Sequence, residues 1–126
     1  MGKAVKWDGS EHTEQVALFE WAATFAPRYP QLDLLFAVPN GGHRHISVAA
    51  RLKREGTRAG VPDILLPVPS KGWHGLFIEL KYGKNKTSKT QDWWLARLTE
   101  QEYLAVVGYG WRDAAETSKD DLGIDE

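Results

Sequence analysis

Two apolar runs separated by a turn constrain this chain more than any other feature. Residues 63–68 (DILLPV) and 76–82 (LFIELKY) have the composition of buried strands, and residues 69–72 (PSKG) have turn-forming chemistry. The pattern predicts a hairpin. Asp63 opens its first strand and Glu79 lies within its second, so the hairpin is expected to bring two carboxylates together inside a sheet.

Paired carboxylates inside a sheet indicate a cation. They repel each other and are costly to remove from water, so something positive has to lie between them. Mg²⁺ prefers octahedral oxygen ligation and retains several waters. Asp63, Glu79 and the main-chain carbonyl of Leu80 would be sufficient protein ligands. The hairpin therefore predicts a metal-dependent site.

Lys81 is expected on the same strand face as Glu79, because side chains alternate along a strand. An isolated Glu-x-Lys is more often a surface ion pair, and Asp63 upstream is what favours a site. The metal would activate a bound water and neutralise charge on a scissile phosphate, while Lys81 could orient that water or stabilise the added charge. This chemistry is phosphodiester hydrolysis.

Two further polar residues could join this site. Glu14 lies on the apolar stripe of a predicted first helix, in line with Leu18 and Trp21, so its carboxylate faces inward. The alternative is a place at the margin of the stripe, where an acid favours the helix N-terminus. Gln91 presents the same choice, because it can complete a capping box with Ser88 or look toward the core.

The charges of the chain are unevenly distributed, although the net charge is only -1. Residues 36–62 carry five basic side chains against one acid, and residues 81–89 carry four lysines and no acid. A phosphate backbone could be held there, although lysines in a loop can also be merely solvated. The candidate DNA contacts are Asn40, Arg44, Arg51, Lys53, Arg54, Lys84, Lys86 and Lys89.

The remaining periodicities predict the elements around the hairpin. Helices are expected over about 11–26 and 46–54 and after the N-cap Ser88, the last with Trp94, Leu95 and Leu98 on its buried face. A buried strand is expected over 34–38 and another over 103–107, broken by residues 108–110. A final amphipathic segment over about 111–117 should fade into a frayed acidic tail.

Composition excludes several function classes. The chain of 126 residues has no cysteine, so thiolate chemistry is excluded and the cytoplasm is the expected compartment. It has no apolar run of about 20 residues for a membrane span and no nucleotide-binding fingerprint. We expect one domain over residues 1–126 with its core at about 11–117, no membrane role and no nucleotide cofactor.

The order of the motifs also carries a family resemblance. The ordered set is Glu14, Pro39-Asn40-Gly41-Gly42 with Arg44, a basic helix, Gly60-Val61-Pro62-Asp63, Glu79-Leu80-Lys81, and Gln91 before Trp94 and Leu95. Over about residues 11–110 it resembles the virus-type replication-repair nuclease (VRR-NUC) domain of the PD-(D/E)xK nuclease superfamily, particularly small stand-alone phage and bacterial members.

The resemblance implies an α/β, restriction-endonuclease-like core, with a mixed four-stranded sheet flanked by helices. It implies Mg²⁺ or Mn²⁺ on Asp63 and Glu79, Lys81 as the catalytic lysine, and Glu14 and Gln91 as auxiliary residues. It also implies a homodimer that cuts branched DNA such as Holliday junctions. A restriction-like duplex nuclease and a non-catalytic DNA-binding or assembly module remain the alternatives to a structure-selective endonuclease.

Overall fold

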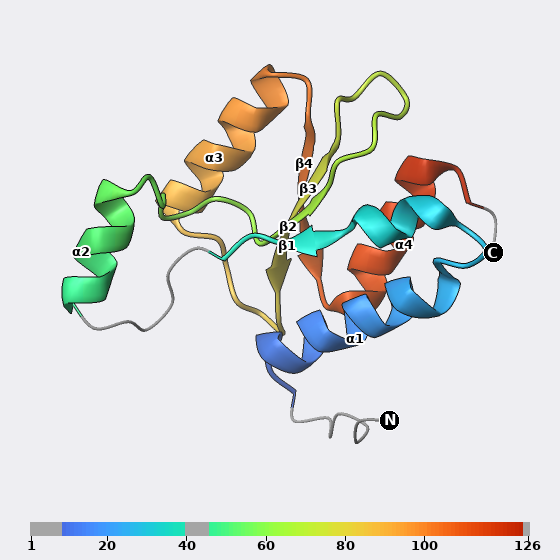
Figure 1. Ribbon diagram of the computed structural model, residues 1–126, viewed down its shortest axis with the longest axis horizontal. Coiled ribbons are helices and arrows are strands. Elements are labelled where there is room, and N and C mark those ends of the chain that lie inside the picture. The colour runs from blue at the N-terminus through green and yellow to red at the C-terminus, as the bar shows by residue number, and fades with distance from the viewer. Residues whose placement is uncertain (1–8, 40–45, 125–126) are drawn as a thin grey trace.

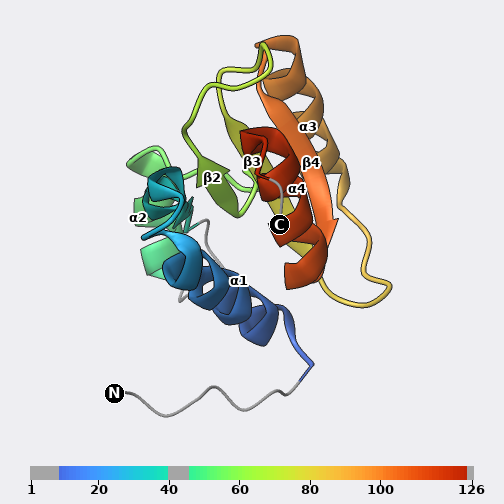
Figure 2. The ribbon, with the colours of Figure 1, turned by 90° about the vertical axis from the view of Figure 1, so that its right-hand side faces the viewer.

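A mixed four-stranded sheet lies between helices (Figures 1 and 2). The structure is a computed structural model that describes residues 9–39 and 46–124. Along the chain the elements are α1 (Glu11–Phe25), the 3-10 helix η1 (Pro30–Leu34), β1 (Phe36–Ala37), α2 (Ile46–Arg54), β2 (Ile64–Leu66), β3 (Leu76–Lys81), α3 (Lys89–Glu100), β4 (Leu104–Tyr109) and α4 (Trp111–Leu122).

The strand order is β1-β2-β3-β4, with antiparallel pairing up to β3 and parallel pairing between β3 and β4. The predicted hairpin is confirmed, because β2 pairs antiparallel with β3 and ends immediately before Pro67. Parallel strands need a crossover connection, and α3 supplies it between β3 and β4. The predicted mixed four-stranded sheet flanked by helices is therefore confirmed.

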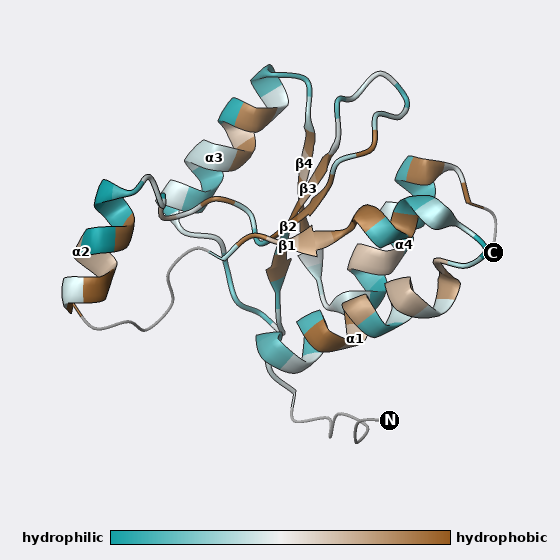
Figure 3. Cartoon of the chain, in the orientation of Figure 1, coloured by the Kyte–Doolittle hydropathy of each residue, from teal (hydrophilic) through white to brown (hydrophobic). Residues whose placement is uncertain are grey.

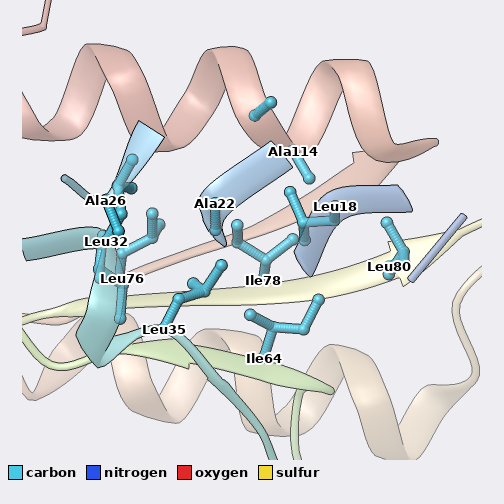
Figure 4. Packing of buried hydrophobic residues seen from close by; sticks show 12 residues of the cluster. Leu18, Ala22, Ala26, Leu32, Leu35, Ile64, Leu76, Ile78, Leu80 and Ala114 are labelled. Carbon is cyan, nitrogen blue, oxygen red and sulfur yellow. The ribbon is translucent and has the colours of Figure 1, made fainter. Parts of the chain in front are cut away.

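The hydrophobic core lies between the sheet and the pair α1 and α4 (Figure 4). Leu18 of α1, Ile78 of β3 and Ala114 of α4 have no exposed surface. The strand β2 and the first half of β3 are hydrophobic, whereas polar residues recur on the helices (Figure 3). Burial of this apolar surface holds the two long helices against one face of the sheet.

We expect Leu18→Ala to lower the free energy of unfolding by about 2–5 kcal/mol, because it leaves a cavity in this core. Urea unfolding followed by circular dichroism measures the change. Leu34→Ala is the matched control, since 51% of the Leu34 surface is exposed. Its effect should stay within about 0.5 kcal/mol. Equal losses in both variants would contradict this description of the core.

The prediction of a buried strand over residues 34–38 is wrong. Only Phe36–Ala37 pairs with β2, and both residues are exposed, because β1 is the edge strand of the sheet. Pro30 instead begins η1, whose geometry turns Leu32 and Leu35 into the core and leaves Leu34 outside. An apolar run without alternation does not by itself distinguish these two structures.

The predicted end of the fourth strand is also wrong, because β4 continues through Gly108 and Tyr109. A Cβ on Gly108 would lie 3.1 Å from Cγ2 of Ile78 and 3.3 Å from Cβ of Ala114. The glycine is therefore a close-packing position where α4 crosses the sheet, and the chain does not turn there. The turn comes one residue after the strand, at Gly110.

The C-terminal tail is not frayed within the described residues, contrary to the prediction. Helix α4 continues to Leu122, and Ser118 and Asp121 are buried. The hydroxyl of Ser70 and the ammonium of Lys71, in the β2–β3 connection, donate to the main-chain carbonyls of Asp121 and Asp120 respectively. These tertiary contacts hold the last turn of α4, which ends at Gly123 in a left-handed cap.

Two helices agree with the prediction in position but not fully in burial. Helix α2 has no buried residue and stands apart from the sheet (Figure 1). Helix α3 begins at the predicted N-cap Ser88. Its inward residues Trp94, Leu95 and Leu98 are only half-buried, so the prediction of a buried face is too strong. Across residues 9–39 and 46–124, none of the helices is long and apolar enough to span a bilayer.

Candidate active site

The Asp63 carboxylate closes the end of the β2–β3 ladder. Its Oδ2 accepts the Leu80 N–H at 2.9 Å. The register pairs Ile64 with Ile78, so its continuation places Pro62 opposite Leu80. Because proline has no N–H, it cannot donate to the Leu80 carbonyl, and regular pairing stops there. The interruption leaves a carboxylate and a main-chain carbonyl at the same end of the ladder.

Glu79 is buried on β3, with 1% of its surface exposed. Its Oε2 accepts a hydrogen bond from Nε2 of Gln91 at 3.2 Å and lies 3.6 Å from Nζ of Lys81. Its Oε1 is buried without a hydrogen-bond partner among the described residues. Burial first, and the charge of Asp63 second, raise the pKa of the Glu79 carboxyl from about 4.5 to about 8. Lys81 opposes this shift only in part.

These features fit a divalent cation. An unsatisfied carboxylate oxygen and a pKa raised by a second carboxylate are what a shared cation would relieve. The described residues contain no group of three or more His, Cys, Asp or Glu side chains that could hold a metal. Asp63, Glu79 and the Leu80 carbonyl would therefore be the protein ligands, with water and phosphate oxygens completing the shell.

Lys81 and Glu79 do not form a surface ion pair. The side chains are 9% and 2% exposed respectively, and they point to the same face of β3. A buried ammonium group is tolerated where a carboxylate lies near it and one end of the side chain still reaches solvent. The structure therefore excludes a surface ion pair of Glu79 and Lys81. The Lys81 ammonium instead lies in the buried site, beside the Glu79 carboxylate.

Gln91 makes both of the interactions that the sequence offered as alternatives, the capping box and a contact with the sheet. Its Oε1 accepts the Ser88 N–H at 2.8 Å, which completes the capping box of α3. Its Nε2 donates to Glu79. One side chain thus anchors the first turn of α3 to β3 and orients the Glu79 carboxylate.

Glu14 is buried and faces inward, but its described hydrogen bond leads to α4. Oε1 accepts the Trp111 N–H at 2.8 Å, at the N-terminus of α4, where Gly110 supplies no side-chain cap. The preceding amide, that of Gly110, donates to the Lys81 carbonyl at 2.8 Å. The amides of Gly110 and Trp111 therefore link Lys81 to Glu14, because one donates to the Lys81 carbonyl and the next to the Glu14 carboxylate. The other carboxylate oxygen of Glu14, Oε2, is buried and has no hydrogen-bond partner among the described residues.

The candidate DNA contacts fall into three groups. Arg51, Lys53 and Arg54 are exposed on α2, with Arg51 3.4 Å from Glu55. Asn40 and Arg44 lie outside the described residues. Lys84, Lys86 and Lys89 are exposed between β3 and the first turn of α3, directly after Lys81.

Sequence reasoning missed Tyr109. The parallel register pairs it with Lys81, so both side chains point to the same face of the sheet. Tyr109 is 53% exposed. A signal was present in the tyrosine at the end of a strand, but the register between distant segments was needed to place it.

The raised pKa of Glu79 would make the binding of a cation at this site dependent on pH. Below about pH 8 the folded protein holds a proton on Glu79 that a cation would have to displace. We expect the Mn²⁺ dissociation constant to fall by up to about tenfold per pH unit between pH 6 and 8 and then to level off. Titration calorimetry at four pH values measures this, and an affinity independent of pH would contradict it.

The same shift predicts the pH dependence of metal-free stability. The unfolded chain releases the Glu79 proton near pH 4.5, whereas the folded chain holds it to about pH 8. The contribution of Glu79 is therefore fully present below pH 4.5 and is lost as the pH rises to 8. Glu79→Gln should flatten this part of the stability profile.

The fold and the site together define the class of protein to which the chain belongs. A mixed sheet that presents an aspartate, a glutamate and a lysine from two adjoining strands is a PD-(D/E)xK-like arrangement. The family model of the VRR-NUC domain matches residues 13–111, so the chain belongs to this family. A nuclease-type function follows from that membership.

A solved structure described as a VRR_NUC domain protein has the same fold. The TM-score is 0.78 at 23% sequence identity, and the similarity covers 99% of this chain and 94% of that chain. No curated protein matches the chain. The likeness therefore extends over the whole chain, including α2 and the full length of α4.

Proposed function

We propose that this protein is a Mg²⁺- or Mn²⁺-dependent endodeoxyribonuclease that hydrolyses phosphodiester bonds, with a preference for branched DNA. The observation that carries the proposal is the buried Glu79 carboxylate, which has one unsatisfied oxygen, lies against Asp63 and adjoins Lys81. A protein that only needed structural stability at this position would gain nothing from a buried glutamate with one unsatisfied oxygen beside a second acid, because this burial is costly.

Each residue has a distinct role in this reaction. Asp63, Glu79 and the Leu80 carbonyl would hold the cation, which when bound supplies Lewis acidity and a water of lowered pKa. The Lys81 ammonium stabilises the negative charge that develops on the phosphate. Gln91 keeps the Glu79 carboxylate oriented from α3. The Asp63 carboxylate also holds the Leu80 amide, so one residue sets the positions of two of the ligands.

The basic side chains support DNA as the substrate. Lys84, Lys86 and Lys89 follow Lys81 directly and are exposed beside the site, and the exposed helix α2 carries a second basic group. Such surfaces hold the phosphate backbone without reading its sequence. Selectivity for branched DNA would then come from shape. A homodimer would present two sites, which suits a two-fold symmetric junction.

Cleavage of a set of matched DNAs tests the substrate preference. We expect a four-way junction to be cut at least about tenfold faster than a linear duplex of the same sequence in Mg²⁺ or Mn²⁺, with single-stranded and flapped DNA as further arms. Cutting of the linear duplex at defined sequences and at an equal rate would favour a restriction-like nuclease instead. If no DNA in the set is cleaved in the presence of the cation, the result would favour the non-catalytic DNA-binding or assembly module.

Metal binding separates an enzyme from that module. Titration calorimetry with Mn²⁺ should show binding to the parent protein and a strong loss with Glu79→Ala. Glu102→Ala is the matched control, because Glu102 is an exposed acid that follows the end of α3. Binding that is absent, or that Glu79→Ala does not change, would contradict the proposed active site.

A further inference from the structure

A pocket lies at the end of β4, where Tyr109 pairs with Lys81. It has a volume of about 360 Å³, within the range of ligand pockets. Its lining residues are Glu14, Tyr109, Gly110, Trp111 and Arg112. Figures 1 and 2 show how β4 leads directly into α4 and how α1 lies beside α4, so three elements contribute to this pocket.

The pocket is fixed to the catalytic lysine by the sheet. Tyr109 pairs with Lys81 in the parallel register, and the Gly110 N–H donates to the Lys81 carbonyl. A group bound in the pocket would therefore lie beside the strand end that carries Lys81. For a DNA substrate, a base held there would lie next to the proposed site of cleavage.

The lining of the pocket suits a flat aromatic ligand. Tyr109 is 53% exposed, and Trp111 is half-buried and packs against the core. The Arg112 guanidinium lies 5.4 Å from the centre of the Trp111 ring, a cation–π contact at the rim. Base stacking on exposed aromatic side chains is the usual way in which proteins hold unpaired nucleotides.

The charge of the lining selects a base over a phosphate. Glu14 is 5% exposed and its Oε2 has no hydrogen-bond partner among the described residues. The Asp113 carboxylate, which accepts the Tyr109 N–H at 2.8 Å, adds a second acid beside the pocket. The two carboxylates outnumber the single Arg112 guanidinium, which disfavours a phosphate, whereas an N–H donor entering the pocket would satisfy the Glu14 oxygen.

We propose that this pocket binds one unpaired nucleobase of the DNA strand, next to the scissile phosphate. The base stacks on Trp111 and Tyr109, and its exocyclic amine donates to Glu14. Adenine, cytosine and guanine carry such an amine, whereas thymine could reach Glu14 only through its ring N3–H, so the pocket favours the first three. This inference rests on the proposed nuclease function and adds to it a contact with one unpaired base beside the site.

Fluorescence of 2-aminopurine tests the proposal without cleavage. The base is placed at successive positions of one unpaired arm of a splayed DNA and titrated with the full-length protein in Ca²⁺, with the DNA checked as intact on a denaturing gel. We expect quenching at one position or at two neighbouring ones. Trp111→Ala should remove this quenching and weaken binding at least about fivefold. Tyr109→Phe, which keeps the ring, should retain it.

A matched control and a double-mutant cycle separate stacking from general loss of binding. Trp93→Ala removes another exposed tryptophan, on α3 and outside the pocket, and should leave the quenching unchanged. An abasic nucleotide at the quenched position should weaken binding by the parent protein but not by Trp111→Ala. Thermal unfolding checks that each variant is folded.

The outcomes are distinguishable from those of the proposed function. Quenching without cleavage in Mg²⁺ would keep the pocket and contradict the nuclease. Cleavage with no quenching at any position, or with equal quenching in Trp111→Ala, would contradict the pocket and keep the nuclease. Equal affinity for adenine and thymine at the quenched position would overturn the assigned role of Glu14.

Discussion

Replacement of Asp63 with asparagine is expected to reduce DNA cleavage by about a thousandfold or more. The substitution removes one of the two negative charges that we propose hold the cation, and the Lewis acidity of such a cation would supply several kcal/mol of transition-state stabilisation. The asparagine side-chain oxygen can still accept the Leu80 N–H, so the end of the β2–β3 ladder is retained. Asparagine is therefore a sharper test than alanine, which would also leave that buried amide unmatched.

The measurement is the single-turnover rate on a four-way junction in Mn²⁺, together with the Mn²⁺ affinity from calorimetry. Both are expected to fall. Asp33→Asn is the matched control, because Asp33 is an exposed aspartate on η1, away from β2 and β3. If Asp63→Asn keeps the parental rate and affinity while remaining folded, Asp63 is not a ligand and the proposed active site is wrong.

Replacement of Lys81 with methionine is expected to slow cleavage by about 100- to 1000-fold while Mn²⁺ binding persists. Methionine has a similar length and no charge, so it removes the stabilisation of the developing phosphate charge and keeps the packing of a side chain that is 9% exposed. No metal ligand is lost. The expected result is therefore a separation of catalysis from metal binding, which Asp63→Asn does not produce.

Lys84→Met is the control for a general loss of positive charge, because Lys84 is exposed in the same basic segment. It should weaken DNA binding and its dependence on salt but leave the single-turnover rate at saturating protein unchanged. A Lys81→Met variant that behaves like Lys84→Met would show that Lys81 only attracts DNA. A variant that loses Mn²⁺ binding as well would show that Lys81 supports the geometry of the two carboxylates.

The site was predictable to the extent that its residues belong to local patterns. Asp63, Glu79 and Lys81 lie on one hairpin, whose turn and alternation determine which side chains share a face. Ser88 and Gln91 form a capping box within one helical turn, so the start of α3 was also predictable. In these cases the interacting residues are close in sequence, and the backbone geometry leaves few alternatives.

The sequence predictions that are wrong concern residues whose structure depends on contacts with distant segments. Residues 34–38 look like a buried strand, but the edge position of β1 exposes Phe36. Gly108 looks like a strand end, but it is needed for the approach of Ala114. The acidic C-terminal segment looks frayed, but Ser70 and Lys71 hold the end of α4. Propensity is a weak prior that tertiary contacts override.

The amino-acid sequence by itself determined the hairpin, the N-terminal cap of α3, and the three charged side chains that this hairpin presents, because each depends on local sequence. Only the tertiary structure decided that Glu14 meets the N-terminus of α4 and that Tyr109 stands beside Lys81. Those contacts join segments separated by a crossover helix or by most of the chain. Their geometry follows from packing and strand register, which no local pattern encodes.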